Sequence, residues 1–419
     1  MKNIYILGGG TFNHVTNHFS LAAPAFGTAA RKIFDLFNQE LVTQGLNEQY
    51  KVHLVLTKMA DYNSDIVTND DVARTIDALV ADPNTKGIIF NVAMTDFKGD
   101  VEGVENGKYA SRLESRGGPY KMNLTTSDKV INRIRKVRKD IFTVGFKTTC
   151  NADEKTLYLK SLKLMKENSL NLVFANDVGN HNNFIVVPEE SKYRGDDRKA
   201  TLELLVKIMA SRMQDRYTRS TVVPGDSINW KSDLVPENLR RVVNHCIQEG
   251  AYKPFQGKTV GHFAVKVGDG VIFTSKRKTN FNELDTVGLV KIESTGDDEV
   301  IAYGAKPSVG GQSQRIIFND HPELDCIAHF HSPVRDEFRN NVVPVKEQWP
   351  HECGSHQCGK NTSDGLQKVD LGGGDSLMVV YLDEHGPNIV FNRNTNPEKI
   401  ISFIDKTFDL KQKTGGLVS

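Results

Sequence analysis

Over about the first 185 residues, short apolar and β-branched runs alternate with stretches whose apolar residues recur at helical spacing. This alternation is typical of a parallel α/β sheet, because each strand is followed by a helix that crosses back over it. The expected strands are Asn3–Leu7, Val52–Leu56, Gly87–Val92, Ile141–Phe146, Leu172–Ala175 and Phe184–Val187. The expected helices include Ala29–Gln44, Asp71–Val80, Ser127–Val137 and Glu154–Asn168.

The pattern changes in the second half of the chain. A charged stretch from Pro188 to Arg219 contains the amphipathic helix Ala200–Met213, and the turn-forming sequence that begins at Val223 indicates a linker. A helix over Glu237–Gln248 then leads into shorter strands with many Gly, Asn and Asp residues, which is typical of an α+β domain. A length of 419 residues fits about two domains, and we expect them at 1–220 and 221–419.

Composition narrows the function classes. The 53 Lys and Arg nearly balance the 52 Asp and Glu, so the chain as a whole has no charge that favours nucleic acid or an anionic membrane. The basic run Arg133–Lys139 is interpreted as a solvated helix face. We find no apolar run long enough to span a bilayer and no signal peptide at the N-terminus. Five scattered cysteines favour a reducing cytoplasm over a disulfide framework.

The most informative short motif is His329-Phe-His331, which follows the apolar run from Leu324 to Ala328. Alternate residues of a strand point to one face, so the two imidazoles would converge on one metal ion. A third candidate ligand is His385, where another apolar run ends in His-Gly. Three neutral nitrogens would leave a coordination position open, as in catalytic zinc sites. A chance pairing of histidines on a solvated strand is the alternative.

Several polar or glycine-rich segments of the first half follow expected strands, where open α/β sheets bind ligands. Gly8-Gly9-Gly10-Thr11 is interpreted as a turn whose amides can approach a phosphate oxygen. Asn91 to Asp96, Gly145-Phe146-Lys147 and Ala175-Asn176-Asp177 also stand at the ends of expected strands. Thr16-Asn17-His18 follows the glycines, and Arg112 to Pro119 is expected in a polar loop.

In this order and spacing, these segments over residues 1–187 resemble phosphopantothenoylcysteine synthetase. The resemblance implies a Rossmann-like, mostly parallel sheet and a ligase that activates a carboxylate with ATP or CTP, with Mg²⁺, before forming an amide. It implies that Asn17 holds the acyl-nucleotide intermediate and that Arg112 contacts the reacting phosphate. Nucleotide-binding positions are implied for Gly9, Gly10, Thr11, Asp96, Phe146, Lys147, Ala175, Asn176 and Asp177.

The first half also departs from that family. Arg112 stands where the family has a lysine, which keeps the charge but changes its geometry. The glutamate expected after Gly-Phe-Lys is absent from Thr148-Thr149-Cys150. Fold and nucleotide binding are therefore firmer expectations than a pantothenate-type substrate.

Residues 235–405 or so resemble the class II aldolase/adducin family through Gly261-His262, Lys306-Pro307-Ser308, His329-Phe-His331 and His385-Gly386. The resemblance implies zinc on His329, His331 and His385, and a small hydroxy-carbonyl substrate, with or without a phosphate group. Candidates for contacts to such a phosphate are Thr274, Ser275, Ser308, Gly310 and Gly311.

The second half departs from its family at the acid/base. The glutamate of the family's Pro-Ser-Ser-Glu loop has no counterpart near Gly310, and Gln312 cannot serve as a base. His351 or His356 is a candidate replacement. A second metal site at Cys353 and Cys358 with the histidines between and beside them is a further alternative.

Two hypotheses follow. The first is a bifunctional enzyme, with a nucleotide-dependent carboxylate–amine ligase-like domain fused to a zinc-dependent aldolase- or epimerase-like domain. The second is a non-catalytic protein that binds a nucleotide and uses a degenerate adducin-like domain for assembly. Under either, we expect small-molecule ligands and neither nucleic acid nor membrane as partner. The resemblance to both families, which assemble as oligomers, implies a homodimer or homotetramer.

Overall fold

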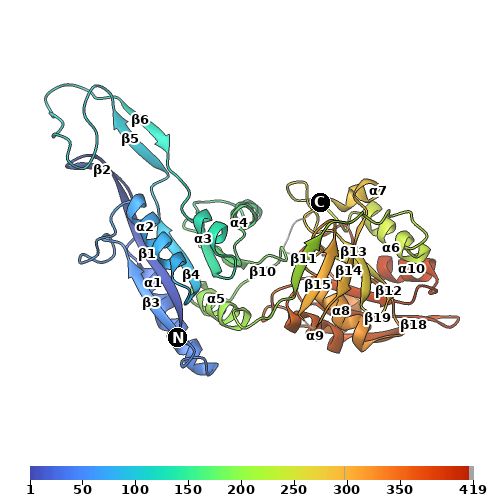
Figure 1. Cartoon of the computed structure of the whole chain (residues 1–419). Coiled ribbons are helices and arrows are strands. Elements are labelled where there is room, and N and C mark those ends of the chain that lie inside the picture. The colour runs from blue at the N-terminus through green and yellow to red at the C-terminus, as the bar shows by residue number, and fades with distance from the viewer. Residues whose placement is uncertain (297, 415–419) are drawn as a thin grey trace. The chain divides into compact units, whose positions relative to one another are not determined.

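The structure is a computed structural model that describes residues 1–296 and 298–414. The chain forms two compact units (Figure 1). Unit 1 comprises Met1–Val187 and Arg194–Met213, and unit 2 comprises Pro188–Tyr193 and the chain from Gln214 onward. The short segment Pro188–Tyr193 thus lies between two parts of unit 1 in the sequence but belongs to unit 2.

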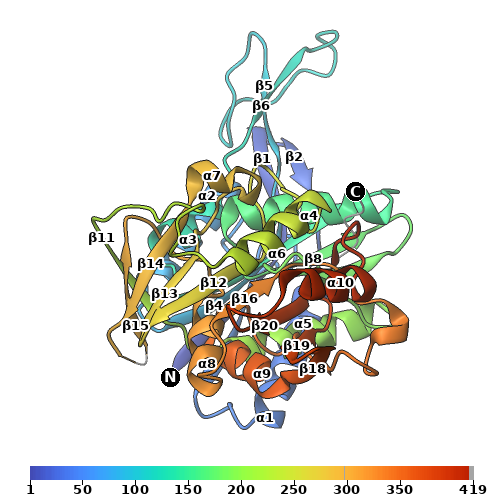
Figure 2. The ribbon, with the colours of Figure 1, turned by 90° about the vertical axis from the view of Figure 1, so that its right-hand side faces the viewer.

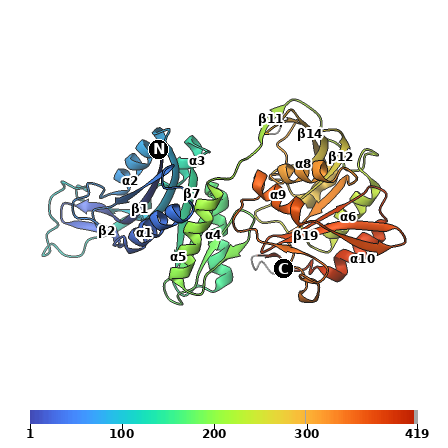
Figure 3. The same ribbon diagram turned by 90° about the horizontal axis from the view of Figure 1, so that it is seen from below.

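Unit 1 is built around a mostly parallel sheet. Its strands run in the order β9-β8-β7-β4-β1-β2, with β3 on β1, and β3, β1, β4, β7 and β8 are mutually parallel. Helices α2 and α3 lie on one side of the sheet and α1 and α5 on the other (Figure 3). The strands are β1 Lys2–Thr16, β2 Phe19–Ala23, β3 Tyr50–Leu56, β4 Thr85–Ala93, β5 Phe97–Val101, β6 Met122–Thr126, β7 Phe142–Thr149, β8 Leu172–Asp177 and β9 Asn183–Val186. The helices are α1 Thr28–Thr43, α2 Asn69–Ala81, α3 Asn132–Val137, α4 Glu154–Asn168 and α5 Arg198–Arg212.

The glycine turn expected after the first strand is absent. Strand β1 continues through Gly8, Gly9 and Gly10, which pair with β4. The glycines serve close packing instead: a Cβ at Gly8 would lie 2.3 Å from the Ala30 Cβ of α1. At Gly9, where φ is +105°, a Cβ would lie 2.2 Å from Thr57 Oγ1. The turn prediction was wrong because glycine's small size, rather than its turn geometry, is what this strand uses.

Beyond the glycines, β1 forms an antiparallel hairpin with β2, and β5 pairs with β6 in a separate two-stranded sheet. Figures 1 and 2 show the β5–β6 hairpin extending away from the main sheet of unit 1. Its exposed apolar side chains include Phe97 (45% exposed) and Leu124 (53% exposed). Neither hairpin follows from the apolar runs of the sequence.

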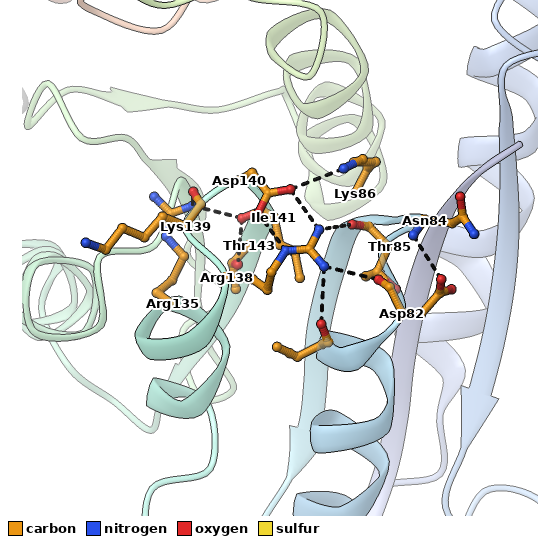
Figure 4. A network of polar contacts seen from close by, with 11 residues as sticks. Asp82, Asn84, Thr85, Lys86, Arg135, Arg138, Lys139, Asp140, Ile141 and Thr143 are labelled. Atoms are coloured by element: carbon orange, nitrogen blue, oxygen red, sulfur yellow. Dashed lines mark hydrogen bonds and ion pairs between the residues drawn. The ribbon is translucent and has the colours of Figure 1, made fainter. Parts of the chain in front are cut away.

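The basic run Arg133–Lys139 is used within the protein. The Arg138 guanidinium donates to the carbonyl oxygens of Val80 and Asp82 at the end of α2, at 3.2 Å each, and binds both Asp140 oxygens at 2.7 and 2.8 Å (Figure 4). Asp140 also pairs with Lys86 at 3.2 Å. The Val80 carbonyl oxygen is one of those that the last turn of a helix leaves without an intrahelical partner, and Arg138 supplies one.

Unit 2 contains a mainly antiparallel sheet with the strand order β11-β15-β14-β13-β12-β16-β20-β19-β17, and β18 lies on β19. The strands of this sheet are β11 Arg219–Val223, β12 His262–Gly268, β13 Val271–Ser275, β14 Leu289–Ser294, β15 Glu299–Tyr303, β16 Cys326–His329, β17 Val345–Lys346, β18 Gln367–Gly372, β19 Asp375–Leu382 and β20 Gly386–Phe391. The two-residue strand β10 Lys192–Tyr193 is not part of this sheet. The helices are α6 Glu237–Gln248, α7 Leu284–Val287, α8 Gly311–Asp320, α9 His356–Gly365, α10 Pro397–Thr407 and the 3₁₀ turns η1 Phe281–Glu283 and η2 Asp336–Phe338.

Alternate residues of the central strands pack on opposite faces of this sheet. Phe263 and Ala328 belong to a core that includes residues of α6 and α10, whereas Ala264 and Ile327 belong to a core that includes residues of α8. Helices α6 and α10 lie together, as do α8 and α9 (Figure 2). Because successive side chains of a strand point to opposite faces of the sheet, every second residue of β12 and β16 faces α8.

The mixed α/β fold class expected from the sequence is confirmed. One local expectation is wrong: Val223 does not begin a linker, because it is the last residue of β11, which pairs in parallel with β15. No helix in the described part of the chain is both long and apolar enough to cross a membrane.

Candidate metal centre

Three buried histidines of unit 2 lie together. His329, His331 and His385 are 1%, 3% and 1% exposed, and one nitrogen of each lies within 4.8 Å of the others. His329 Nε2 is 3.3 Å from His385 Nε2. These are the three residues that the sequence motif identified as candidate ligands.

The local backbone differs from the expected strand. His329 is the last residue of β16, and His331 follows in an irregular segment. His385 lies in the turn between β19 and β20, preceded by Glu384 at φ 57° and followed by Gly386 at φ 142°. A Cβ at Gly386 would lie 2.1 Å from the Phe330 carbonyl oxygen, so glycine is required for the two histidine segments to meet.

The surroundings of His329 prepare it to bind a cation. Its Nδ1 lies 2.8 Å from the Pro387 carbonyl oxygen, which accepts a hydrogen bond from an Nδ1–H. That tautomer leaves the lone pair on Nε2, the atom that faces His385. Burial lowers the pKa of His329 to about 4, against the smaller raising effect of the Pro387 hydrogen bond, so the ring is neutral at pH 7.

The donor set fits a zinc ion. Two nitrogens bound at 2.0–2.1 Å to one tetrahedral Zn²⁺ would be roughly 3.3–3.4 Å apart. The His329–His385 nitrogen separation of 3.3 Å matches that spacing. In the described residues, no other group of three or more His, Cys, Asp or Glu side chains is arranged to hold a metal.

A fourth histidine extends the centre. His262 is paired across the strands with His329, and Asn388 is paired with His329 from the other side, so the three side chains form a row on the α8 face of the sheet. The rings of His262 and His329 are 4.7 Å apart. Gln314 Nε2 of α8 lies 2.9 Å from His262 Nδ1. Burial and the neighbouring His329 hold the pKa of His262 well below its usual range.

His262 occupies space that a side chain at position 310 would need. A Cβ at Gly310 would lie 2.0 Å from His262 Cδ2 and 2.4 Å from its Nε2. The glutamate that is missing from this loop could therefore not be accommodated beside His262. In the sequence, His262 was noted only as part of the segment Gly261-His262, and no role beside the metal ligands was expected of it. The histidine–glycine complementarity required the structure, because the two residues are 48 positions apart.

The buried acceptors Gln314 Oε1 and Asn388 Oδ1 have no hydrogen-bond partner in the described structure. Both residues belong to the histidine row or contact it. An unpaired buried acceptor is costly, so these two oxygens are suited to receive hydrogen bonds from a bound molecule or water.

The expected phosphate-contacting residues lie on neighbouring elements. Thr274 and Ser275 are buried on β13, and the Ser308 amide donates to the Ser275 carbonyl oxygen at 2.8 Å. Gly310 caps the N-terminus of α8, and Gly311 is the first residue of that helix. The five residues are thus grouped near the first turn of α8, although the Ser308 amide is already used within the protein.

The segment with interleaved histidines and cysteines does not form a closed metal site. His351 Nδ1 lies 3.3 Å from Asp215 Oδ1, and His356 Nδ1 lies 3.1 Å from Gln312 Nε2. The Cys353 and Cys358 thiols are instead hydrogen-bonded to each other, which raises the pKa of Cys353 and lowers that of Cys358. The histidines and cysteines of this segment therefore have separate partners.

In unit 1, part of the expected nucleotide set comes together at the ends of β7 and β8. The rings of Phe146 and Phe174 pack at 5.3 Å, and Lys147 and Ala175 are register partners. Thr148 Oγ1 donates to Asn176 Oδ1 at 3.1 Å. These strand ends form one edge, where α/β sheets present ligand-binding groups.

Asp177 organises the loops at this edge. Its carboxylate accepts hydrogen bonds from Thr149 Oγ1 and from the amides of Asn151, Ala152, Gly179 and Asn180, at 2.7–3.0 Å. Burial raises the pKa of Asp177, but the hydrogen bonds outweigh burial and hold the pKa well below its usual range. The structure gives this residue a loop-organising role that the sequence did not indicate.

The remaining candidates of unit 1 lie elsewhere. Asn17 is exposed in the β1–β2 turn, roughly 20 Å along β1 from Gly10 at about 3.3 Å per residue. Arg112 is exposed in the loop between β5 and β6, and Asp96 is exposed and paired with Lys129. Thr11 is buried and donates to Asn69 Oδ1 at 2.6 Å. The structure does not bring Asn17 to the strand ends that carry Phe146 and Lys147 within one chain.

Comparison with known proteins gives one curated relative for the N-terminal half. The chain is 29% identical over 188 residues to the coenzyme A biosynthesis bifunctional protein CoaBC of Methanocaldococcus jannaschii, a match that covers 43% of this chain and 41% of the relative. The chain thus spans less than half the length of that relative. No model of a known protein family matches the chain.

Solved structures give weaker likenesses. The DNA/pantothenate metabolism flavoprotein from Streptococcus pneumoniae matches with a TM-score of 0.41 at 18% identity, over 50% of this chain and 99% of that one. An L-fuculose 1-phosphate aldolase matches with a TM-score of 0.29 at 14% identity, over 39% of this chain and 79% of that one.

Proposed function

We propose that the protein is a bifunctional enzyme whose C-terminal half is a zinc-dependent lyase or epimerase for a small hydroxy-carbonyl compound. The observation that carries this proposal is the cluster of His329, His331 and His385. Three buried imidazoles would supply the ligands of an open catalytic zinc site. When bound there, zinc would act as a Lewis acid that polarises a carbonyl group.

The chain's own residues supply orientation and recognition. The Pro387 carbonyl oxygen accepts a hydrogen bond from His329 Nδ1–H and so fixes the orientation of the His329 ring. Gln314 fixes the neighbouring His262 ring through the contact between its Nε2 and His262 Nδ1. The acceptors Gln314 Oε1 and Asn388 Oδ1 are available to hydroxyl groups of the substrate. The surrounding side chains keep the histidines almost free of solvent, which strengthens electrostatic interactions inside the centre.

We place a substrate phosphate, where the substrate carries one, near the first turn of α8. Support comes from the grouping of Thr274, Ser275, Ser308, Gly310 and Gly311, and from the affinity of helix N-termini for anions. The acid/base is assigned to His351 or His356, of which His356 lies beside Gln312. That assignment predicts that His351→Ala or His356→Ala loses turnover, whereas the control change His321→Ala in the same unit keeps it.

For the N-terminal half we propose a carboxylate–amine ligase-like activity that uses ATP or CTP with Mg²⁺. Support comes from the 29% identity to the coenzyme A biosynthesis protein and from the polar edge of β7 and β8. The proposed nucleotide contacts are Gly9, Gly10, Thr11, Asp96, Phe146, Lys147, Ala175, Asn176 and Asp177. Asn17 and Arg112 are proposed for the reacting groups, in an oligomer that brings the exposed hairpin loops of one chain to the strand ends of another.

The oligomer and the compartment belong to the same proposal. We propose a dimer or tetramer in which Phe97 and Leu124, exposed on the β5–β6 hairpin, lie in the contact between chains, because exposed apolar surface is what such contacts cover. The five cysteines form no disulfide, which favours the cytoplasm.

Metal analysis of the full-length protein tests the proposal. We expect about one zinc per chain, and its loss in His331→Ala, while His321→Ala keeps it. A screen of hydroxy-carbonyl compounds should then give metal-dependent turnover that chelation abolishes and zinc restores. Purified protein that folds but binds no divalent metal would contradict the proposed zinc enzyme and favour the non-catalytic hypothesis.

For the N-terminal half, phosphate or pyrophosphate release in mixtures of carboxylates and amines should fall in Asn17→Ala.

A further inference from the structure

Two carbonyl groups of the histidine centre are held by a single residue near the end of the described chain. The Thr414 amide donates to the His331 carbonyl oxygen at 3.1 Å, and Thr414 Oγ1 donates to the His385 carbonyl oxygen at 3.0 Å. Thr414 is only 5% exposed. One residue thus bridges the irregular segment that carries His331 and the turn that carries His385.

The neighbour of Thr414 is fixed by a buried ion pair. Lys413 Nζ lies 2.6 Å from Glu190 Oε2, and the two side chains are 3% and 2% exposed. Lys413 also donates to the Lys253 carbonyl oxygen at 3.2 Å. A buried pair of this kind contributes position more than stability, because desolvation of the charges offsets their attraction.

Glu190 belongs to the segment Pro188–Tyr193, which also supports the turn before His385. Ser191 Oγ donates to the Glu384 carbonyl oxygen, and the Tyr193 hydroxyl lies 3.5 Å from the Asp383 carbonyl oxygen. Glu190 and Glu384 both have left-handed backbones, with φ 66° and 57°. Non-glycine residues keep such a conformation only where surrounding contacts impose it, and functional sites are where this is most often found.

We propose that Glu190, Ser191, Lys413 and Thr414 form a supporting layer that positions His331 and His385 for metal binding. These are positioning residues, since none contacts a ligating atom: Thr414 binds the backbone carbonyl groups of His331 and His385. Glu190 holds Lys413, the neighbour of Thr414, and Ser191 holds Glu384, the residue before His385. The inference rests on the proposed zinc centre. It adds that residues 188–193, which lie between β9 and α5 in the sequence, help to position the ligands of the C-terminal site.

The supporting layer acts on two of the three candidate ligands, His331 and His385. His329 is already oriented by Pro387, whereas the main chain at His331 and His385 lies outside regular strands. Loss of the layer should therefore leave the fold and the His329 ring in place while the other two nitrogens lose their fixed separation. Metal affinity and coordination geometry should change before stability does.

The test measures zinc affinity of the full-length protein by competition with a chromophoric chelator, and the visible spectrum after cobalt substitution. Thr414→Val removes the hydroxyl, and we expect zinc to bind about 10-fold more weakly, as is usual when groups that orient ligands are lost. Thr414→Ser keeps the hydroxyl and should bind zinc like the wild type. The Co²⁺ absorption of Thr414→Val should be altered, with Thr414→Ser restoring it.

Glu190→Gln tests the ion pair and should also weaken zinc binding. Because that change leaves Lys413 buried without its counter-ion, the double variant Glu190→Gln/Lys413→Met is made alongside to remove both charges. The matched control is Lys231→Met, which breaks the exposed pair with Asp285, whose side chains are 72% and 61% exposed. We expect zinc affinity in Lys231→Met to equal that of the wild type.

The outcomes separate this inference from the proposed function. Wild-type protein without zinc would overturn both. Wild-type protein with zinc, together with wild-type affinity and cobalt spectrum in Thr414→Val and in the folded Glu190 variants, would overturn the supporting layer alone.

Discussion

The absence of a side chain at Gly310 leaves room for the His262 ring. The His262 ring fills the space in which a Cβ at Gly310 would stand, 2.0 Å from His262 Cδ2. Gly310→Ala should lower the free energy of unfolding by about 1–3 kcal/mol, as overpacking in a core does.

The clash belongs to the pair, so His262→Ala should relieve it. In a double-mutant cycle we expect Gly310→Ala/His262→Ala to be less destabilised than the sum of the single changes, with denaturant unfolding as the measurement. Additive free energies would show that the two positions do not share this space.

Asp177 should make unit 1 sensitive to acid. Its pKa is lowered in the folded state, so folding is favoured while the pH is above the unfolded value near 3.9, and this contribution is lost as the pH falls further. Asp177→Asn should reduce stability at neutral pH and flatten the acid dependence, measured by amide hydrogen exchange of β8. The exposed Asp35→Asn is the control, and equal acid profiles of the two variants would contradict this role.

The three candidate metal ligands could be identified from the sequence because spacing and apolar context are local. The residues that hold them could not. Thr414 is far from His331 and His385 in sequence, and it binds their backbone carbonyl groups, which carry no residue signature. Glu190 is farther still, and it acts only through its ion pair with Lys413. For Asp177 the sequence identified the residue as a candidate for nucleotide binding. Only the structure shows that its carboxylate binds loop amides.

At the scale of elements, amphipathic helices were the best predicted. Glu154–Asn168 and Glu237–Gln248 agree with α4 and α6 residue for residue. Strand β1 was predicted only over Asn3–Leu7, since three glycines normally end a strand. Helix α3 is shorter than expected and begins at Asn132, and His331 lies past the end of β16.

Strand β1 gives a test of why its glycines are present. Gly9→Ala combines a positive φ of 105° with a Cβ 2.2 Å from Thr57 Oγ1, and should cost about 2–3 kcal/mol of unfolding free energy. Gly45 has a φ of 67° but no atom within 4 Å of a Cβ, so Gly45→Ala should cost about 1 kcal/mol. Thermal unfolding of both variants decides the matter: equal losses would contradict the packing role of Gly9.

At the scale of the whole molecule, the chain has a convenient reporter. Both tryptophans, Trp230 and Trp349, lie in unit 2, so tryptophan fluorescence follows that unit alone. Zinc should increase the free energy of unfolding of unit 2, followed by tryptophan fluorescence. The expected increase is about 2.7 kcal/mol when the free zinc concentration is one hundred times the dissociation constant. Hydrogen exchange of β4 and β7 in unit 1 should not change, whereas nucleotide with Mg²⁺ should protect unit 1 instead.

We propose above that the three histidines of unit 2 hold a catalytic zinc ion. Zinc-edge X-ray absorption of the zinc-loaded, full-length protein tests it most directly. We expect nitrogen or oxygen neighbours at about 2.0–2.1 Å, with imidazole scattering beyond them. Sulfur neighbours at about 2.3 Å would instead place the metal on Cys353 and Cys358, and the three histidines would not be its ligands.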